Sequence, residues 1–222
     1  MVKSNNDFRE RLSHVIWIGG GTDSGKSSVA DVIAGRLGLN AYHYDRSEMD
    51  HIHRLSGVSK EHRELLNDLE SASMDEWWVY PTPQELTERS LQSFLVRFLP
   101  ALEDLMASDE RVIAEGFGFT PDLLISVLKS ASQAVWLVPT EQFKLASMAR
   151  RNKPSFRDKV SDPERGTQNL IDRDAMLSER SRGQAERHGF SVYTVDGSKT
   201  IEEMADMLVE HFQPYIATAW ST

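Results

Sequence analysis

The sequence has no cysteine in its 222 residues. Neither a disulfide bond nor a thiolate metal site is therefore available to this protein. Long apolar runs are also lacking, and none approaches the roughly 20 residues of a membrane-spanning helix. Residues 1–11 are polar and charged, unlike a secretory signal. From these absences we expect a cytoplasmic location and no membrane partner.

Positive charge is scarce, with 25 Lys and Arg against 34 Asp and Glu and a net charge of −9. An acidic chain repels the phosphate backbone, so we expect no nucleic-acid partner. Residues 144–187 differ from the rest, because they hold 11 basic and 7 acidic residues. This segment is either a surface for anions or a solvated helix face with ion pairs, and the sequence favours neither.

Short apolar segments alternate with helical patterns along the chain. The candidate strands are residues 14–19, 40–44, 111–115, 133–138 and 191–195. This alternation predicts an α/β fold, in which helices cover both faces of a mostly parallel sheet. The length suits one α/β domain with a helical elaboration, or at most two small domains.

Capping signals mark where several helices begin. Thr82-Pro83-Gln84-Glu85 combines an N-cap, a proline at the first helical position and a capping-box glutamate, and it predicts a helix toward Met106 that Pro100 kinks. Further starts are expected at Thr120-Pro121, after Thr140, and at Thr200 with Glu203. The apolar residues expected to face a core are Leu86, Leu91, Phe94, Leu95, Phe98 and Leu102 in the first helix, and Ile201, Met204, Ala205, Leu208 and Phe212 in the last.

Residues 20–27 read Gly-Gly-Thr-Asp-Ser-Gly-Lys-Ser and match the pattern G-x-x-x-x-G-K-[ST] in full. An apolar run precedes this segment and a helical pattern follows it. Backbone N–H groups of such a loop bind phosphate together with the helix N-terminus, whereas an ordinary glycine-rich turn does not need Lys-Ser at its end. The pattern therefore predicts a nucleoside triphosphate site. Its expected contacts are Gly20, Gly21, Thr22, Asp23, Ser24, Gly25, Lys26, Ser27 and Ser28, with Lys26 on the β- and γ-phosphates and Ser27 on Mg²⁺.

Two carboxylates follow candidate strands. Asp45 closes the second strand, where it would accept a proton from a substrate hydroxyl, help to hold Mg²⁺ through water, or merely cap the next helix. Glu115 closes the third strand beside the phosphate loop, where we expect it to help hold Mg²⁺ directly or through water; the alternative interpretation is a simple strand-end turn. Gly116 and Gly118 are expected to leave room for a substrate there.

Segments 46–82 and 152–166 read as insertions, and the second is long, polar and typical of a lid. We expect residues 150–182 to form a basic lid that stabilises charge during phosphoryl transfer and excludes water. Its arginines are mostly surface residues, and those predicted to act in catalysis, with Lys26 and Asp45, are Arg150, Arg151 and Arg173. Trp77-Trp78-Val79-Tyr80 forms either a stacking wall for an acceptor or core beneath the insertion. His51, His53 and His62 do not have the spacing of a metal site.

Taken together, these residues resemble the P-loop kinase group, which includes nucleoside monophosphate kinases and chloramphenicol phosphotransferase-like small-molecule kinases. The resemblance rests on residues 20–27, Asp45, Glu115-Gly116-Phe117, Arg150-Arg151 and Val195-Asp196-Gly197-Ser198, of which only the phosphate loop is specific. It implies a single P-loop kinase domain over 1–222, with sheet order 2-3-1-4-5, ATP and Mg²⁺ as cofactors, and a helical acceptor segment at 46–110. It also implies that Gly197 and Ser198 lie near adenine.

One departure from the family bears on the acceptor. Nucleotide kinases usually carry an Asp-Gly-Phe-Pro-Arg-type turn whose arginine holds the acceptor phosphate, whereas Glu115-Gly116-Phe117-Gly118-Phe119 contains no arginine. We therefore favour an ATP-dependent phosphotransferase whose partner is a small hydroxyl-bearing acceptor: a metabolite, sugar, nucleoside or antibiotic. A nucleoside monophosphate kinase and a nucleotide-dependent regulatory ATPase with a protein partner remain alternatives. The sequence leaves the oligomeric state open.

Overall fold

The computed structural model describes residues 5–57, 60, 63 and 71–220. Five strands form one sheet in the order β2-β3-β1-β4-β5, and all neighbouring strands are parallel. The strands are β1 (Val15–Gly20), β2 (Asn40–His43), β3 (Val112–Glu115), β4 (Ala134–Pro139) and β5 (Ser191–Val195). The predicted fold class and the predicted strand order are confirmed.

Helices connect these strands and cover both faces of the sheet. The first half of the chain contributes α1 (Asn5–Arg11), α2 (Lys26–Leu37), the 3₁₀ helix η1 (Tyr44–Ser47), α3 (Glu48–Ser56), α5 (Met74–Trp78) and α6 (Pro83–Leu105). The second half contributes α7 (Pro121–Leu124), η2 (Ala131–Gln133), α8 (Glu141–Arg150), η3 (Arg157–Lys159), α9 (Pro163–Arg187) and α10 (Ile201–Ala219). Within the described residues, no helix is long and apolar enough to cross a membrane.

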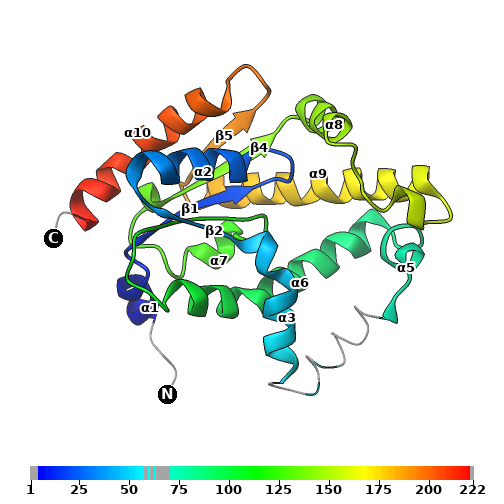
Figure 1. Ribbon diagram of the computed structural model, residues 1–222, viewed down its shortest axis with the longest axis horizontal. Helices are drawn as coiled ribbons and strands as arrows, with labels where there is room; N and C mark the ends of the chain where they lie inside the picture. Colours follow the sequence, from blue (N-terminus) through cyan, green and yellow to red (C-terminus); the bar gives the residue numbers. More distant parts are fainter. Residues whose placement is uncertain (1–4, 58–59, 61–62, 64–70, 221–222) are drawn as a thin grey trace.

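Alternate residues of the central strand β1 enter two different cores. Val15 and Trp17 pack with residues of α6, α7 and α9, whereas Ile16 and Ile18 pack with α2 and α10. Figure 1 shows α2 and α10 above the sheet and α6 and α7 below it. Because both faces are buried, the central strands read as continuous apolar runs. The carboxyl ends of the strands are left as the place for a ligand.

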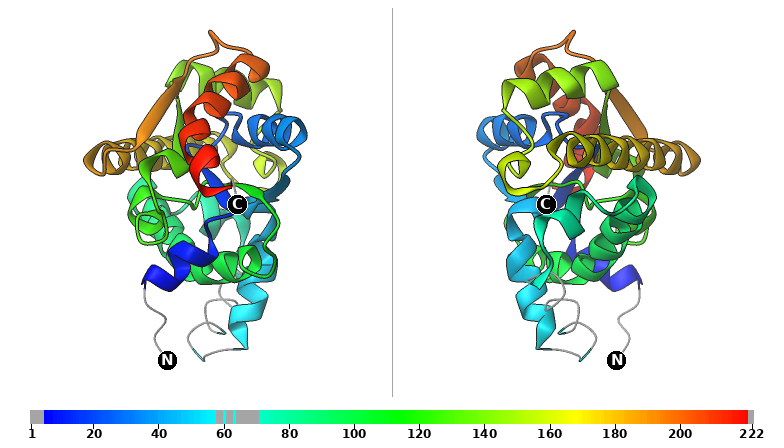
Figure 2. Two further views of the ribbon diagram at one scale, coloured as in Figure 1. Left: turned by 90° about the vertical axis from the view of Figure 1, so that its left-hand side faces the viewer. Right: turned by 90° about the vertical axis from the view of Figure 1, so that its right-hand side faces the viewer.

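The helix starts agree with the capping signals. Thr82 and Thr200 both make complete capping boxes, and Thr140 accepts a hydrogen bond from the backbone N–H of Phe143. Helix α6, which lies in the segment predicted to hold the acceptor, also packs against the sheet, because its residues Phe94 and Leu102 belong to the core. Helix α3 contacts α6 and crosses it in Figure 1, and in both views of Figure 2 α3 (cyan) extends toward the lower end of the molecule.

Several expectations about this architecture are wrong. Leu95 and Ile201 do not face a core, since their side chains are 64% and 40% exposed. The predicted loop 152–166 ends at Asp162, the N-cap of α9. From Pro163 onward the chain is one continuous helix that packs against α6 and the sheet, so only residues 151–162 form a connecting segment; the lid role of residues 150–182 stays a prediction. His62 lies outside the described residues.

Candidate active site

The phosphate loop joins β1 to α2 in a conformation that its glycines require. Gly20 and Gly25 have φ angles of 115° and 83°. A Cβ on Gly20 would lie 2.1 Å from the carbonyl oxygen of Leu137, so no other residue fits there. The Gly21 carbonyl accepts from Ser24 Oγ over 2.8 Å and from Lys26 Nζ over 2.6 Å. The loop therefore closes on itself and presents the N-terminus of α2, the arrangement that binds phosphate.

Lys26 is buried at the first position of α2. Burial lowers the pKa of its ammonium group, and the carboxylates of Asp45 and Glu115 are the leading charges that oppose this change. A phosphate bound in the loop would supply further negative charge to this lysine. Ser28, on the same turn, is exposed.

Ser27 and Glu115 are brought together as predicted. Ser27 Oγ donates to Glu115 Oε1 over 2.9 Å, and this leaves the serine lone pairs available for a cation. Glu115 is 2% exposed, yet its Oε2 has no hydrogen-bond partner among the described residues. A buried carboxylate oxygen without a partner beside a serine hydroxyl fits the oxygen ligands of Mg²⁺. These two residues would hold the metal directly or through its water.

Asp45 lies in η1 rather than in the second strand, which ends at His43. Its Oδ2 accepts from the backbone N–H of Phe117 over 3.3 Å, so it ties η1 to the turn after β3. The side chain opens into a cleft, and the surrounding protein still removes enough water to raise its pKa, with Lys26 opposing the shift. Such a carboxylate can take up a proton at the edge of the phosphate site.

A network of charged side chains that the sequence analysis missed lies behind the phosphate loop. Lys144 Nζ, from α8, donates to Thr22 Oγ1 over 2.7 Å and to Asp174 Oδ2 over 2.6 Å. Thr22 in turn donates to Asp174 Oδ2 over 2.6 Å. Lys144 and Asp174 are both buried, so α8 and α9 are fixed to the loop through a shielded ion pair.

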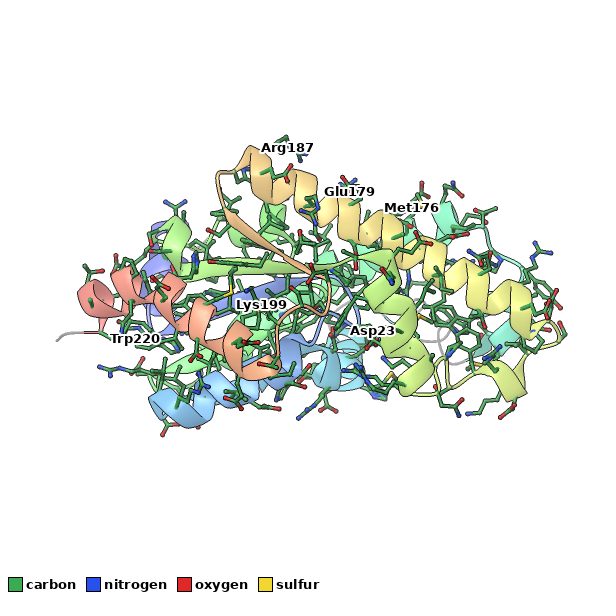
Figure 3. All side chains as sticks on the ribbon, turned by 90° about the horizontal axis from the view of Figure 1, so that it is seen from above. Asp23, Met176, Glu179, Arg187, Lys199 and Trp220 are labelled. Atoms are coloured by element: carbon green, nitrogen blue, oxygen red, sulfur yellow. The ribbon has the colours of Figure 1, made fainter. Side chains whose placement is uncertain are left out.

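The predicted basic residues divide between the site and the surface. Arg151 and Lys153 reach Asp23 Oδ1 in the phosphate loop at 3.4 and 3.0 Å. Burial raises the pKa of Asp23, but the Lys153 hydrogen bond and the nearby cations outweigh it and the net shift is downward. Figure 3 shows Asp23 beside α8, with Met176, Glu179 and Arg187 on the outer side of α9. Arg150 is exposed, and no ion pair joins it to another described residue.

Arg173 bridges this network to a neighbouring cleft. Its Nε lies 2.8 Å from Asp174 Oδ1, its Nη1 donates to Ser90 Oγ over 3.2 Å, and its guanidinium lies over the Trp78 and Phe117 rings. The cleft measures about 1240 Å³. Its lining includes Thr22 of the phosphate loop, Asp45, Arg97, Phe117 and Arg173, with Met49, Met74, Trp77, Trp78, Tyr80 and Leu95 on the apolar side.

The glycines after Glu115 leave room for the protein's own Tyr44, not for a substrate. A Cβ on Gly116 would lie 2.5 Å from Tyr44 Cβ, and one on Gly118 would lie 2.3 Å from Tyr44 Cε1. The Tyr44 ring is fully buried. The expectation of substrate space at these two positions is therefore wrong. Trp77 and Tyr80 do line the cleft, as the stacking-wall interpretation requires, whereas Val79 between them is buried.

Gly197 and Ser198 form a turn after β5. The backbone N–H and the hydroxyl of Ser198 both donate to Asp196 Oδ1, over 2.9 and 2.6 Å. Ile201, which follows on α10, approaches the phosphate loop at Gly25. A contact of this turn with adenine stays a prediction.

No family model and no curated protein matches the chain. Solved structures that match include an uncharacterized protein from Eubacterium ventriosum, with 13% identity, a TM-score of 0.42, and coverage of 90% of this chain and 98% of that one. Shikimate kinase from Bacteroides thetaiotaomicron matches with 12% identity, a TM-score of 0.49, and coverage of 91% and 98%. Shikimate kinase from Aquifex aeolicus matches with 16% identity, a TM-score of 0.40, and coverage of 92% and 99%. Independently of these similarities, the parallel order β2-β3-β1-β4-β5 and the phosphate loop after its central strand give this chain the predicted three-layer P-loop NTPase fold.

Proposed function

We propose that this protein is an ATP-dependent phosphotransferase that phosphorylates a hydroxyl group of a small molecule. One observation carries the proposal: Asp45 and Thr22 of the phosphate loop line the same cleft. An acceptor in that cleft would lie between a carboxylate that can take its proton and the loop that holds the phosphoryl donor.

The reaction assigns a role to each group. The acceptor oxygen forms a bond to the γ-phosphorus of ATP, the bond from that phosphorus to the β–γ bridging oxygen breaks, and the hydroxyl proton passes to Asp45. Lys26 stabilises the charge on the transferring group, and Arg173 adds positive potential from the cleft while it stays beside Asp174. Mg²⁺, when held by Ser27 and Glu115, neutralises charge on the phosphates.

The charges of the cleft favour an uncharged acceptor over a nucleoside monophosphate. Arg97 already donates to Glu48 Oε1 and to the Tyr44 carbonyl, and Arg89 donates to the Glu76 carbonyl. Arg173 is paired with Asp174. Each arginine in the described lining thus has a partner, and an acceptor phosphate would have to displace one of them.

The test begins with a thermal-shift screen of hydroxyl compounds and nucleoside monophosphates in the presence of Mg²⁺ and a non-hydrolysable ATP analogue. ADP release is then measured with the compounds that stabilise the protein. Asp45→Asn is expected to lower acceptor-dependent turnover by at least about 100-fold, because a general base contributes this much. Asp50→Asn, an exposed control on α3, is expected to leave turnover unchanged.

Two results would contradict the proposal. Unchanged turnover in Asp45→Asn would refute the assignment of Asp45 as the general base. Turnover with a nucleoside monophosphate and with no hydroxyl compound would assign the chain to the other kinase class.

A further inference from the structure

His43 contacts the candidate magnesium site, although the chemistry proposed above gives it no role. Its Nδ1 lies 2.7 Å from Glu115 Oε1, and its Nε2 lies 3.1 Å from Asp31 Oδ1. The ring is only 11% exposed. The imidazole is therefore held from both sides between two carboxylates.

The four residues at this place come from two structural pairs, one on adjacent strands and one on a single helix. His43 and Glu115 are register partners on the parallel strands β2 and β3. Ser27 and Asp31 are four residues apart on α2, so they share one face of that helix. Ser27 contacts Glu115, Glu115 contacts His43, and His43 contacts Asp31, so three contacts connect the four side chains from one turn of α2 to the next.

The contacts with Ser27 and His43 fix the orientation of the Glu115 carboxylate. Its Oε1 accepts from Ser27 Oγ and lies within hydrogen-bond distance of His43 Nδ1. Its Oε2 is buried and has no hydrogen-bond partner among the residues that the structure describes. Both anchoring contacts fall on one oxygen, so the other is left to a ligand. A cross-strand tie with a purely structural purpose would not require an oxygen to remain unpaired.

We propose that His43 is a positioning residue, which holds Glu115 so that Oε2 faces the divalent cation that accompanies the nucleotide. On the opposite side of the imidazole, Asp31 Oδ1 lies 3.1 Å from Nε2. The inference rests on the proposed function only for its premise that a nucleotide binds with Mg²⁺; it needs no acceptor and no phosphoryl transfer. Groups that orient a ligand in this way typically change metal affinity by 10- to 100-fold when they are replaced.

The test compares His43→Leu, which removes the Nδ1 donor, with His43→Asn, whose amide N–H can take its place. Binding of a fluorescent non-hydrolysable ATP analogue is titrated with Mg²⁺ and, separately, in EDTA. We expect His43→Leu to reduce the gain in affinity that Mg²⁺ brings by about tenfold or more. Affinity in EDTA should stay close to that of the wild type, and His43→Asn should recover most of the gain.

His51→Leu is the matched control, because His51 is also a buried histidine beside a carboxylate, that of Asp104, and does not contact the phosphate loop. It is expected to leave the Mg²⁺ response intact. Equal losses with and without Mg²⁺ in His43→Leu, or no loss, would overturn the positioning role. So would a wild-type protein whose nucleotide binding ignores Mg²⁺. A wild type that binds Mg²⁺ and nucleotide normally but phosphorylates nothing would instead refute the proposed function alone, and one that binds no nucleotide would refute both.

Discussion

Lys144 Nζ lies 2.6 Å from Asp174 Oδ2, and both side chains are buried behind the phosphate loop. The two residues come from α8 and α9, and both of them contact Thr22 of the loop. Removing two charges from water is costly, and the attraction between them offsets this cost best when further hydrogen bonds are present, as Thr22 supplies here to both partners. The ion pair thus couples the position of two helices to the shape of the loop.

Replacing Lys144 with Met should strongly destabilise the protein. The substitution keeps much of the side-chain volume but leaves the buried Asp174 carboxylate with Arg173 as its remaining cationic partner. Because that guanidinium still compensates part of the charge, we expect a loss of about 3 kcal/mol of unfolding free energy, the lower end of the cost of breaking a buried pair. Urea denaturation of the two proteins measures the difference.

Arg36→Ala provides the control for that measurement. Arg36 also contacts two carboxylates, those of Glu202 and Asp206, but on an exposed surface. Exposed pairs contribute about 0–1 kcal/mol, so its loss should be barely detectable. Equal destabilisation by the two substitutions would show that burial of the Lys144 pair is not what matters.

Gly118→Ala should destabilise the turn after β3. The new methyl group would lie 2.3 Å from Tyr44 Cε1, and the fully buried ring has no space to move. Overpacking of this kind costs about 1–3 kcal/mol. Gly35→Ala on α2 is the opposite case, because nothing lies within 4 Å of the added atom, and alanine favours a helix over glycine by about 1 kcal/mol. Thermal unfolding should therefore move down for the first variant and up for the second; a downward shift in both would contradict the steric argument.

The fold was predictable because its signals are local or strictly periodic. The phosphate loop is set by residue spacing alone, and burial on both faces makes β1 and β4 recognisable as apolar runs. Two apolar residues that fit a helical stripe were wrongly predicted to face a core. Leu95 faces the cleft, and Ile201 lies at the edge of the phosphate loop. A stripe shows that a helix is amphipathic, but not where its packed stretch begins or ends.

The site was predictable only where chain order fixes it. Ser27 and Glu115 could be paired because the strand before the loop and the third strand were expected to be neighbours. The same reasoning could have placed His43 beside Glu115, because the expected sheet order makes the second and third strands neighbours and both residues lie at the ends of these strands. Lys144 and Asp174 gave no such signal, since their contact depends on how two helices pack.

Acid should abolish the proposed phosphoryl transfer through Asp45, at a higher pH than an ordinary aspartate would. Burial raises the pKa of Asp45 above its usual 3.8, and only the ionised form can accept a proton. As the pH falls through that raised pKa, the base is lost and kcat/KM declines. The pH profile with an acceptor from the screen measures this, and a profile flat down to pH 4 would contradict it.

The raised pKa of Asp45 also affects stability, and in the opposite direction: the ionised form that serves catalysis lowers the unfolding free energy. A carboxyl group with a raised pKa binds protons more tightly in the folded state, so above that pKa its ionisation disfavours folding. Asp45→Asn should therefore leave the unfolding free energy at pH 7 unchanged or higher, while turnover is lost. A large loss of stability in this variant would instead assign Asp45 a structural role.

Arg150 and Arg151 were both predicted to act in catalysis, and the structure separates them. Arg151 Nη1 lies 3.4 Å from Asp23 Oδ1 in the phosphate loop, whereas the Arg150 side chain is exposed on α8. A guanidinium at the loop can move to a phosphate oxygen, and a hydrogen bond to a charged group contributes about 1.5–3 kcal/mol. Arg151→Ala should therefore weaken binding of a non-hydrolysable ATP analogue by about tenfold or more, and high salt should reduce the difference. Arg150→Ala should change the affinity less than twofold in the same titration. Equal effects of the two substitutions would mean that the general positive charge of this segment, and not the position of Arg151, attracts the nucleotide.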